Sequence, residues 1–212
     1  MEATIDMGQE TFLDCLRRVQ AIAQNGLAYS RDPFDLERFE ELQKLAAEGL
    51  SSLCAGDAPD WMAVLMPEKG YATPKLTVRG GVFRDDQVLL VRERSDGKWT
   101  LPGGWVDVNE SPSEAITKEV REESGYEAIA RKLVAVHDRR KHAHPPMFFH
   151  VYKLFFLCEL VGGTATESIE TDGVGFFPEA GLPELSTPRV NADQIRMLFR
   201  HQRTPGLATE FD

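Results

Sequence analysis

Residues 111–125, with the sequence SPSEAITKEVREESG, decide the fold because they specify one helix from both ends. Ser111 can cap the N-terminus, Pro112 suits the first turn, and Glu114 can reach back to close a capping box. Gly125 follows the last turn, where a residue with positive φ commonly ends a helix. The sequence therefore predicts a helix that starts at about Pro112 and stops before Gly125.

This helix carries acidic side chains beside its apolar stripe. Ile116 and Val120 form the stripe that faces the core. At about 100° per residue, Glu119, Glu122 and Glu123 fall together next to it. Glu119 and Glu123 are one turn apart with no basic residue within helical reach, and such a like-charged pair costs about 0.2–0.5 kcal/mol. A bound hard cation such as Mg²⁺ would remove this repulsion, whereas a solvated acidic face would show interleaved basic partners.

The remaining charges of the helix predict ordinary surface pairing. Glu114, Lys118 and Glu122 follow one another at intervals of four residues. Opposite charges at this spacing lie close together on a helix, so we expect Lys118 to pair with both glutamates.

The sequence around the helix resembles the Nudix box. Gly104 is followed after five residues by Glu110, and after seven more by the run KEVREESGY, which starts at Lys118. The box reads Gly-x5-Glu-x7-Arg-Glu-apolar-x-Glu-Glu-x-Gly-apolar, and seven of its nine restricted positions match. Lys118 replaces the usual Arg and keeps its charge without the bidentate fork, and Tyr126 replaces the usual aliphatic residue. The resemblance extends over about residues 74–203.

The resemblance implies a fold and an activity. The expected fold is the Nudix α/β/α sandwich, an α/β fold with a mixed sheet, preceded by a small N-terminal helical region. The expected enzyme is a metal-dependent pyrophosphohydrolase that cleaves a nucleoside diphosphate linked to another moiety, with Mg²⁺ or Mn²⁺. A CDP-choline-like substrate is favoured, because residues 26–34 are similar to a bacterial subgroup with such members. ADP-ribose pyrophosphatase, nucleoside-triphosphate cleansing and a noncatalytic nucleotide-binding regulator are the alternatives.

The resemblance also implies a metal site. Glu119, Glu122 and Glu123 correspond to the metal ligands of the family. The Gly103 carbonyl corresponds to a further ligand, and Glu110 to a structural residue that holds the loop before the helix. Metal ions bound there would neutralise the diphosphate and lower the pKa of the attacking water.

The general base is expected in the box helix or on a later loop, since family members differ in its position. Glu119 and Glu123 are the helical candidates. On the loop before residues 174–177, Glu170 is preferred to Glu167. The base takes the proton of the attacking water.

Four further residues are candidate substrate contacts. Arg79 and Arg92 lie on strands before the box, and Arg139 and His142 lie in a later segment rich in histidine. Arginine suits phosphate because it can donate two parallel hydrogen bonds; a solvated loop is the alternative for the later segment. A zinc site at His142 and His144 is disfavoured, because no cysteine is near and the spacing matches no common structural zinc pattern.

Two amphipathic helices are predicted within residues 1–68, an expected dimerisation region, before a hydrolase domain at 74–212. Gly26 stands where the first helix would end, and Asp32-Pro33 would start the second. The helices cannot bury their stripes alone, so they pack on the same chain or, as we favour, on a second copy in a homodimer. The stripes are Phe12, Cys15, Leu16, Val19, Ile22 and Ala23, then Phe39, Leu42, Ala46, Leu50 and Leu53.

Strands interleaved with helices predict a mixed sheet covered on both faces. Asn191 and Gln194 are spaced as a capping box for a final helix. The expected strands span residues 78–83, 88–91, 133–136, 148–160 and 174–177, and the final helix spans 192–202.

The composition restricts the classes of partner. A formal net charge of −10 argues against nonspecific binding to nucleic acid or to an anionic membrane. The three cysteines are far apart in apolar surroundings, which predicts reduced core thiols. With neither a signal peptide nor an apolar run long enough to span a bilayer, we expect a cytoplasmic protein. Its substrate is a small anionic molecule, handled through a cation or a basic cluster.

Overall fold

The computed structural model describes residues 7–54 and 59–212, and it divides the chain into two compact units. One comprises Met1–Pro74 with Pro146–His150, and the other comprises Lys75–Pro145 with Val151–Asp212. Residues 1–6 and 55–58 of the predicted helical region lie outside the described residues. Each unit has its own hydrophobic core.

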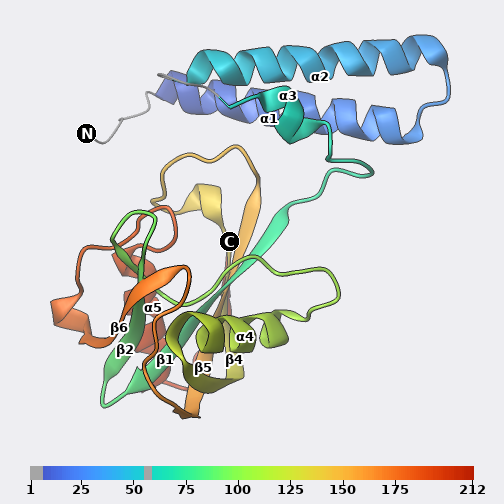
Figure 1. The fold of residues 1–212 in the computed structure, drawn as a ribbon. Coiled ribbons are helices and arrows are strands. Elements are labelled where there is room, and N and C mark those ends of the chain that lie inside the picture. The colour runs from blue at the N-terminus through green and yellow to red at the C-terminus, as the bar shows by residue number, and fades with distance from the viewer. Residues whose placement is uncertain (1–6, 55–58) are drawn as a thin grey trace. The chain divides into compact units, whose positions relative to one another are not determined.

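The first unit is built on a helical hairpin of α1 (Met7–Tyr29) and α2 (Pro33–Leu53), with the short α3 (Trp61–Leu65) alongside (Figure 1). The predicted start of the second helix is confirmed: the Asp32 carboxylate accepts the N–H groups of Phe34 and Asp35. The core of the unit gathers aliphatic side chains from all three helices: Leu13, Leu16, Ala47, Leu50 and Leu65.

The predicted end of the first helix at Gly26 is wrong, because α1 continues to Tyr29. The ring of Phe39 on α2 occupies the space that a Cβ at position 26 would need. Gly26 therefore allows the two helices to pack closely. The glycine that we interpreted as a helix end is required by this packing instead.

The second unit holds a seven-stranded mixed sheet in the order β3-β2-β1-β5-β4-β7, with β6 paired to β2. The strands β1 and β2 form the predicted antiparallel hairpin, while β1 and β5 run parallel. The strand predicted from residue 148 begins instead at Val151, because residues 146–150 belong to the first unit. The bounds are β1 Lys75–Arg84, β2 Gln87–Glu93, β3 Trp99–Thr100, β4 Tyr126–Asp138, β5 Val151–Gly163, β6 Thr171–Pro178 and β7 Glu210–Phe211.

Helices α4 (Pro112–Ser124) and α5 (Ala192–Arg203) pack on opposite faces of this sheet (Figure 1). Both predicted capping boxes are present, and Gly125 ends α4 with a φ of 74°. Ile116 and Val120 of α4 join one buried cluster of the sheet, and Ile195 of α5 joins the other. The α/β fold with a mixed sheet is confirmed.

Two composition-based expectations have different outcomes. Cys158 is buried in the sheet, but Cys15 is exposed on α1, so the prediction of a core thiol is wrong for Cys15. Among the described helices, we find none that combines the length and the apolar character needed to cross a membrane.

Candidate active site

The site is built around a glycine loop that lies along β1. β1 is paired with β2 only next to the hairpin turn, and the earlier part of the same strand edge binds this loop. The N–H of Val78 donates to the Gly104 carbonyl at 2.9 Å, and that of Gly80 donates to the Pro102 carbonyl at 2.9 Å. Gly103 has a φ of 142°, and a Cβ there would collide with the carbonyl oxygen of Val78. Only glycine allows the loop to lie this close to the strand.

Glu123 is anchored to this loop. Its side chain is 5% exposed, and Oε2 accepts the N–H of Gly103 at 2.8 Å. Thr171 at the start of β6 donates its hydroxyl to the Glu123 carbonyl at 2.7 Å, which ties the end of α4 to the sheet. Burial raises the pKa of Glu123 to about 8, although Arg79 and the Gly103 hydrogen bond oppose the shift.

Glu119 faces the same loop one turn earlier. Its carboxylate lies against Gly104, where a Cβ would have no room. Partial burial raises the pKa of Glu119, and the negative charges of Glu122 and Glu170 add to the shift, while Arg79 opposes it. Glu119 and Glu123 therefore both point at the loop and away from bulk solvent, as the cation hypothesis requires.

Glu122 is placed differently from the other two glutamates. Its side chain is 52% exposed and lies 3.8 Å from Arg121. Within residues 7–54 and 59–212, no three His, Cys, Asp or Glu side chains converge closely enough to hold a metal ion. The donors still fit a divalent cation in kind, since the three carboxylates at i, i+3 and i+4 occupy neighbouring positions on one side of the helix.

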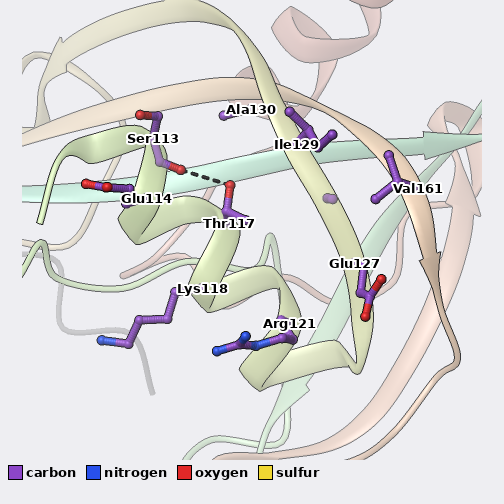
Figure 2. Close-up of a pocket in the computed structure, with 10 residues that line it drawn as sticks. Ser113, Glu114, Thr117, Lys118, Arg121, Glu127, Ile129, Ala130 and Val161 are labelled. Carbon is purple, nitrogen blue, oxygen red and sulfur yellow. Dashed lines mark hydrogen bonds between the residues drawn. The ribbon is translucent and has the colours of Figure 1, made fainter.

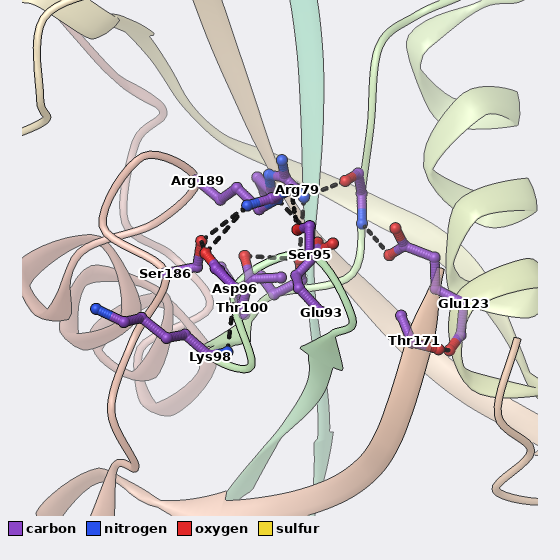
Figure 3. Close-up of polar contacts among 12 residues, drawn as sticks. Arg79, Glu93, Ser95, Asp96, Lys98, Thr100, Glu123, Thr171, Ser186 and Arg189 are labelled. Carbon is purple, nitrogen blue, oxygen red and sulfur yellow. Dashed lines mark hydrogen bonds and ion pairs between the residues drawn. The ribbon is translucent and has the colours of Figure 1, made fainter. Parts of the chain in front are cut away.

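Arg79 supplies the positive charge behind the loop. Its side chain is 6% exposed, and its guanidinium donates to the carbonyls of Leu101, at 3.2 Å, and of Gly103. Arg79 and Glu123 thus bind the same loop from opposite sides (Figure 3). These contacts make Arg79 a residue that positions the loop, while the substrate contact expected of Arg79 from the sequence stays a prediction. A cation on the Gly103 carbonyl would also lie beside this guanidinium, so we leave that carbonyl out of the ligand set.

A second ion pair, which the sequence analysis did not predict, extends this network. Glu93 at the end of β2 is 6% exposed, and its Oε1 lies 2.9 Å from Nε of Arg189. Burial raises the pKa of Glu93, and the charges of Arg189 and Arg79 oppose the shift. Arg189 also contacts Asp96 at 3.3 Å (Figure 3). Strand alternation could have placed Glu93 and Arg79 inward, but the pairing with Arg189 depends on tertiary structure.

The predicted ladder on α4 is wrong for Lys118. Its Nζ lies 3.0 Å from Glu110 and 3.2 Å from Asp107, both in the loop before the helix. Glu114 instead closes the capping box with Ser111. Lys118 therefore fastens the preceding loop to α4, and Glu110 stands where the resemblance implies a loop-holding residue.

Of the loop acids, Glu170 lies nearer to the carboxylates. Its charge raises the pKa of both Glu119 and Glu93, whereas Glu167 is paired with Arg94 at 3.3 Å. The side chain of Glu170 is exposed, and its carbonyl accepts the N–H of Arg94 at 2.8 Å. The loop thus holds Glu170 on the side of the site.

The other predicted contacts lie apart from the carboxylates. Arg92, on the strand face opposite Glu93, pairs with Asp172 of β6 at 2.7 Å. Arg139, in a short 3₁₀ turn, is 6% exposed and donates to the Pro188 carbonyl at 3.5 Å. His142 stacks on His137 with ring centroids 3.8 Å apart.

The outer face of α4 borders a groove of about 680 Å³ (Figure 2). Thr117, Lys118 and Arg121 line it from the helix, and Ile129 and Val161 from the adjacent strands. Glu119 and Glu123 project from the other side of α4, so this groove is separate from the carboxylates.

Comparisons with known proteins define the class. Residues 74–199 match the NUDIX domain, and residues 10–60 match a domain described as UDP-X-like, N-terminal oligomerisation domain. The chain belongs to the Nudix family and is a Nudix hydrolase, in the group with an N-terminal helical extension. Hydrolases of this family generally require a divalent metal.

Two of the relatives match almost the whole chain, and a third matches about two thirds of it. YjhB of Bacillus subtilis (strain 168) is 46% identical over 204 residues, which are 96% of this chain and 98% of that protein. The structure of a UDP-X diphosphatase matches with a TM-score of 0.62 and 34% identity, over 96% of this chain and 99% of that one. An ADP-ribose pyrophosphatase from Streptococcus suis 89-1591 matches with a TM-score of 0.62 and 40% identity, over 66% of this chain and 100% of that one.

Proposed function

We propose that this Nudix hydrolase cleaves the pyrophosphate bond of a nucleoside diphosphate linked to a second moiety X, releasing a nucleoside monophosphate and phospho-X. The observation that carries the proposal is the packing of Glu119 and Glu123 against one glycine loop, with Glu123 buried and bound to the Gly103 N–H. Burying two carboxylates so close together is unfavourable unless a cation or Arg79 compensates their charge. Burial raises the pKa of both groups, and Arg79 opposes the shift.

The comparisons support two substrate classes. The N-terminal match and the UDP-X diphosphatase structure favour a pyrimidine nucleotide, of which a CDP-choline-like compound is one form. The name given to YjhB and the Streptococcus suis structure refer to ADP-ribose pyrophosphatase, which makes ADP-ribose the second candidate.

In the proposed reaction Glu119, Glu122 and Glu123 hold Mg²⁺, or Mn²⁺ in its place. When bound there, such a cation would neutralise the diphosphate and lower the pKa of a water molecule. Glu170, exposed beside the site, takes the proton of that water, with Glu119 as the alternative base. Arg79 keeps the glycine loop against both carboxylates throughout.

Substrate and metal are tested together on a nucleotide panel. We expect turnover of CDP-choline, UDP-linked sugars or ADP-ribose with Mg²⁺, and loss of activity in excess EDTA that added Mg²⁺ restores. The measurement is the release of nucleoside monophosphate, which chromatography quantifies. Tight binding of these compounds without any turnover would overturn the proposal in favour of a nucleotide-binding regulator.

We also propose that the first unit joins two copies of the chain. Beside the buried stripe of α1 runs a second apolar stripe in which Phe12 is 42% and Ile22 is 55% exposed, and on α2 Leu45 is 50% exposed. These positions lie within the segment that matches the oligomerisation domain. A second copy is the partner of matching chemistry for such a surface.

Replacing Ile22 by Asp is expected to give monomers at micromolar concentration, since the wild-type side chain gains about 1.5–3 kcal/mol on full burial and a buried carboxylate adds a penalty. Sedimentation equilibrium measures the change. Val161→Asp is the matched control, because Val161 is 50% exposed in the second unit. A wild-type protein that is monomeric under these conditions would remove the proposal.

A further inference from the structure

A buried lysine lies on the sheet face that carries Arg79. Lys153 on β5 is 3% exposed, and its Nζ donates to the Arg189 carbonyl. In the register of the sheet it is paired with Thr77 of β1 and with His137 of β4. Phe155, two residues further along β5, belongs to the core cluster under α5, so Lys153 lies on the α5 face.

Three guanidinium groups raise the cost of a positive charge on Lys153. The groups that act on its ammonium are the guanidinium groups of Arg79, Arg139 and Arg189, and within the described residues no carboxylate is paired with it. Burial, together with these three charges, lowers the pKa of Lys153 to about 6. We call Arg79, Arg139, Lys153 and Arg189 the cationic cluster.

Carboxylates lie beside two members of the cationic cluster, Arg189 and Arg79. Arg189 is paired with Glu93 and Asp96, and Arg79 faces the carboxylates of the site. Nε of Arg79 is buried without a hydrogen-bond partner among the described residues, so one donor remains to be satisfied. An uncompensated buried ammonium costs several kcal/mol, which an anion bound beside it would offset.

The cationic cluster contacts the glycine loop, and an exposed aromatic residue, Trp105, follows that loop. Arg79 donates to the carbonyl of Gly103, and the N–H of the same glycine donates to Glu123. The cluster and the carboxylates of α4 therefore contact the same residue of the glycine loop. Trp105, just after the loop, is bridged to Thr77 and is 45% exposed. Directly paired residues share a sheet face, and Thr77 is paired with both Trp105 and Lys153. The partly exposed Trp105 therefore lies on the same face as Lys153.

We propose that Lys153, within the cationic cluster, binds one phosphate group of the diphosphate substrate on the α5 side of the glycine loop. The inference rests on the proposed function and adds a binding residue to it. The carboxylates of α4 would hold the metal on one side of the loop, and the cationic cluster would hold phosphate oxygens on the other. His137 and His144 also face Lys153, and burial lowers the pKa of each to about 4, so both are neutral at pH 7.

The test is equilibrium binding of product-like anions to the full chain in EDTA, which separates this site from the metal. The probes are inorganic pyrophosphate, CMP and AMP for the nucleotide half, and phosphocholine and ribose 5-phosphate for the other half. Lys153→Met removes the charge at nearly constant length. Lys132→Met is the matched control, since Lys132 on β4 donates to the carbonyls of Pro205 and Leu207.

Lys153→Met is expected to weaken binding of pyrophosphate and of one product half by tenfold or more, and to raise KM for the substrate. Its Tm should not fall, because an apolar side chain replaces a buried amine whose charged form is disfavoured by burial. If only CMP and AMP lose affinity, Lys153 binds the nucleotide phosphate. If only phosphocholine and ribose 5-phosphate lose affinity, it binds the phosphate of X. Either result supports the proposal. Affinities within twofold of wild type for every probe, or no binding of any probe by the wild type, would overturn it. Intact anion binding without turnover of the nucleotide panel would instead reject the proposed function.

Discussion

Glu123→Gln is expected to lower kcat about 10³-fold at saturating Mg²⁺ while leaving the fold intact. Several kcal/mol of transition-state stabilisation depend on a correctly held divalent cation, and a loss of about 4 kcal/mol corresponds to that factor. The amide keeps the volume of the side chain, and its oxygen can still accept the Gly103 N–H. Because burial already disfavours the charged form of Glu123, the neutral amide should not reduce Tm.

Steady-state kinetics over a range of Mg²⁺ concentrations, with Tm measured alongside, tests this expectation. Glu127→Gln is the matched control, since Glu127 is an exposed glutamate just after α4. Near-normal turnover for both Glu123→Gln and Glu119→Gln at saturating Mg²⁺ would show that neither carboxylate holds the metal, and the proposed ligand set would be wrong.

The sequence was sufficient where the structure depends on neighbours along the chain. The start and the end of α4 follow from Ser111, Glu114 and Gly125, which act within a turn of the residues that they affect. Its inner face follows from the spacing of Ile116 and Val120. The same spacing placed Glu119 and Glu123 on the side that meets the loop. Local chemistry therefore sufficed for the candidate catalytic helix.

The charge environment of that helix could not be obtained in the same way. The absence of a basic residue within helical reach of Glu119 and Glu123 was correct, yet Arg79 approaches both from β1. Lys118 likewise has partners in the preceding loop, Glu110 and Asp107, because tertiary contacts brought better-placed carboxylates than those one turn away. A helical projection contains only the charges of the helix itself.

Arg79→Met is expected to destabilise the fold by about 3–5 kcal/mol and to lower kcat, which is the second large effect. Among positive charges, the guanidinium acts most strongly on Glu123 and Glu119, and it also acts on Glu93. Without it, three carboxylates at least partly buried lose their compensation, and the Gly103 and Leu101 carbonyls lose a donor. Both losses fall on the loop that the carboxylates contact.

Urea denaturation measures the stability loss, and kinetics at a temperature where both proteins are folded measures the effect on kcat. Arg79→Lys should recover part of the stability, because it restores the charge but not the two-armed contact. Adding Glu93→Gln to Arg79→Met should also recover stability, because it removes one of the uncompensated charges, and the double-mutant cycle gives the coupling. Additive effects of these two substitutions would show that Arg79 and Glu93 do not interact, and the network behind the glycine loop would then have no energetic basis.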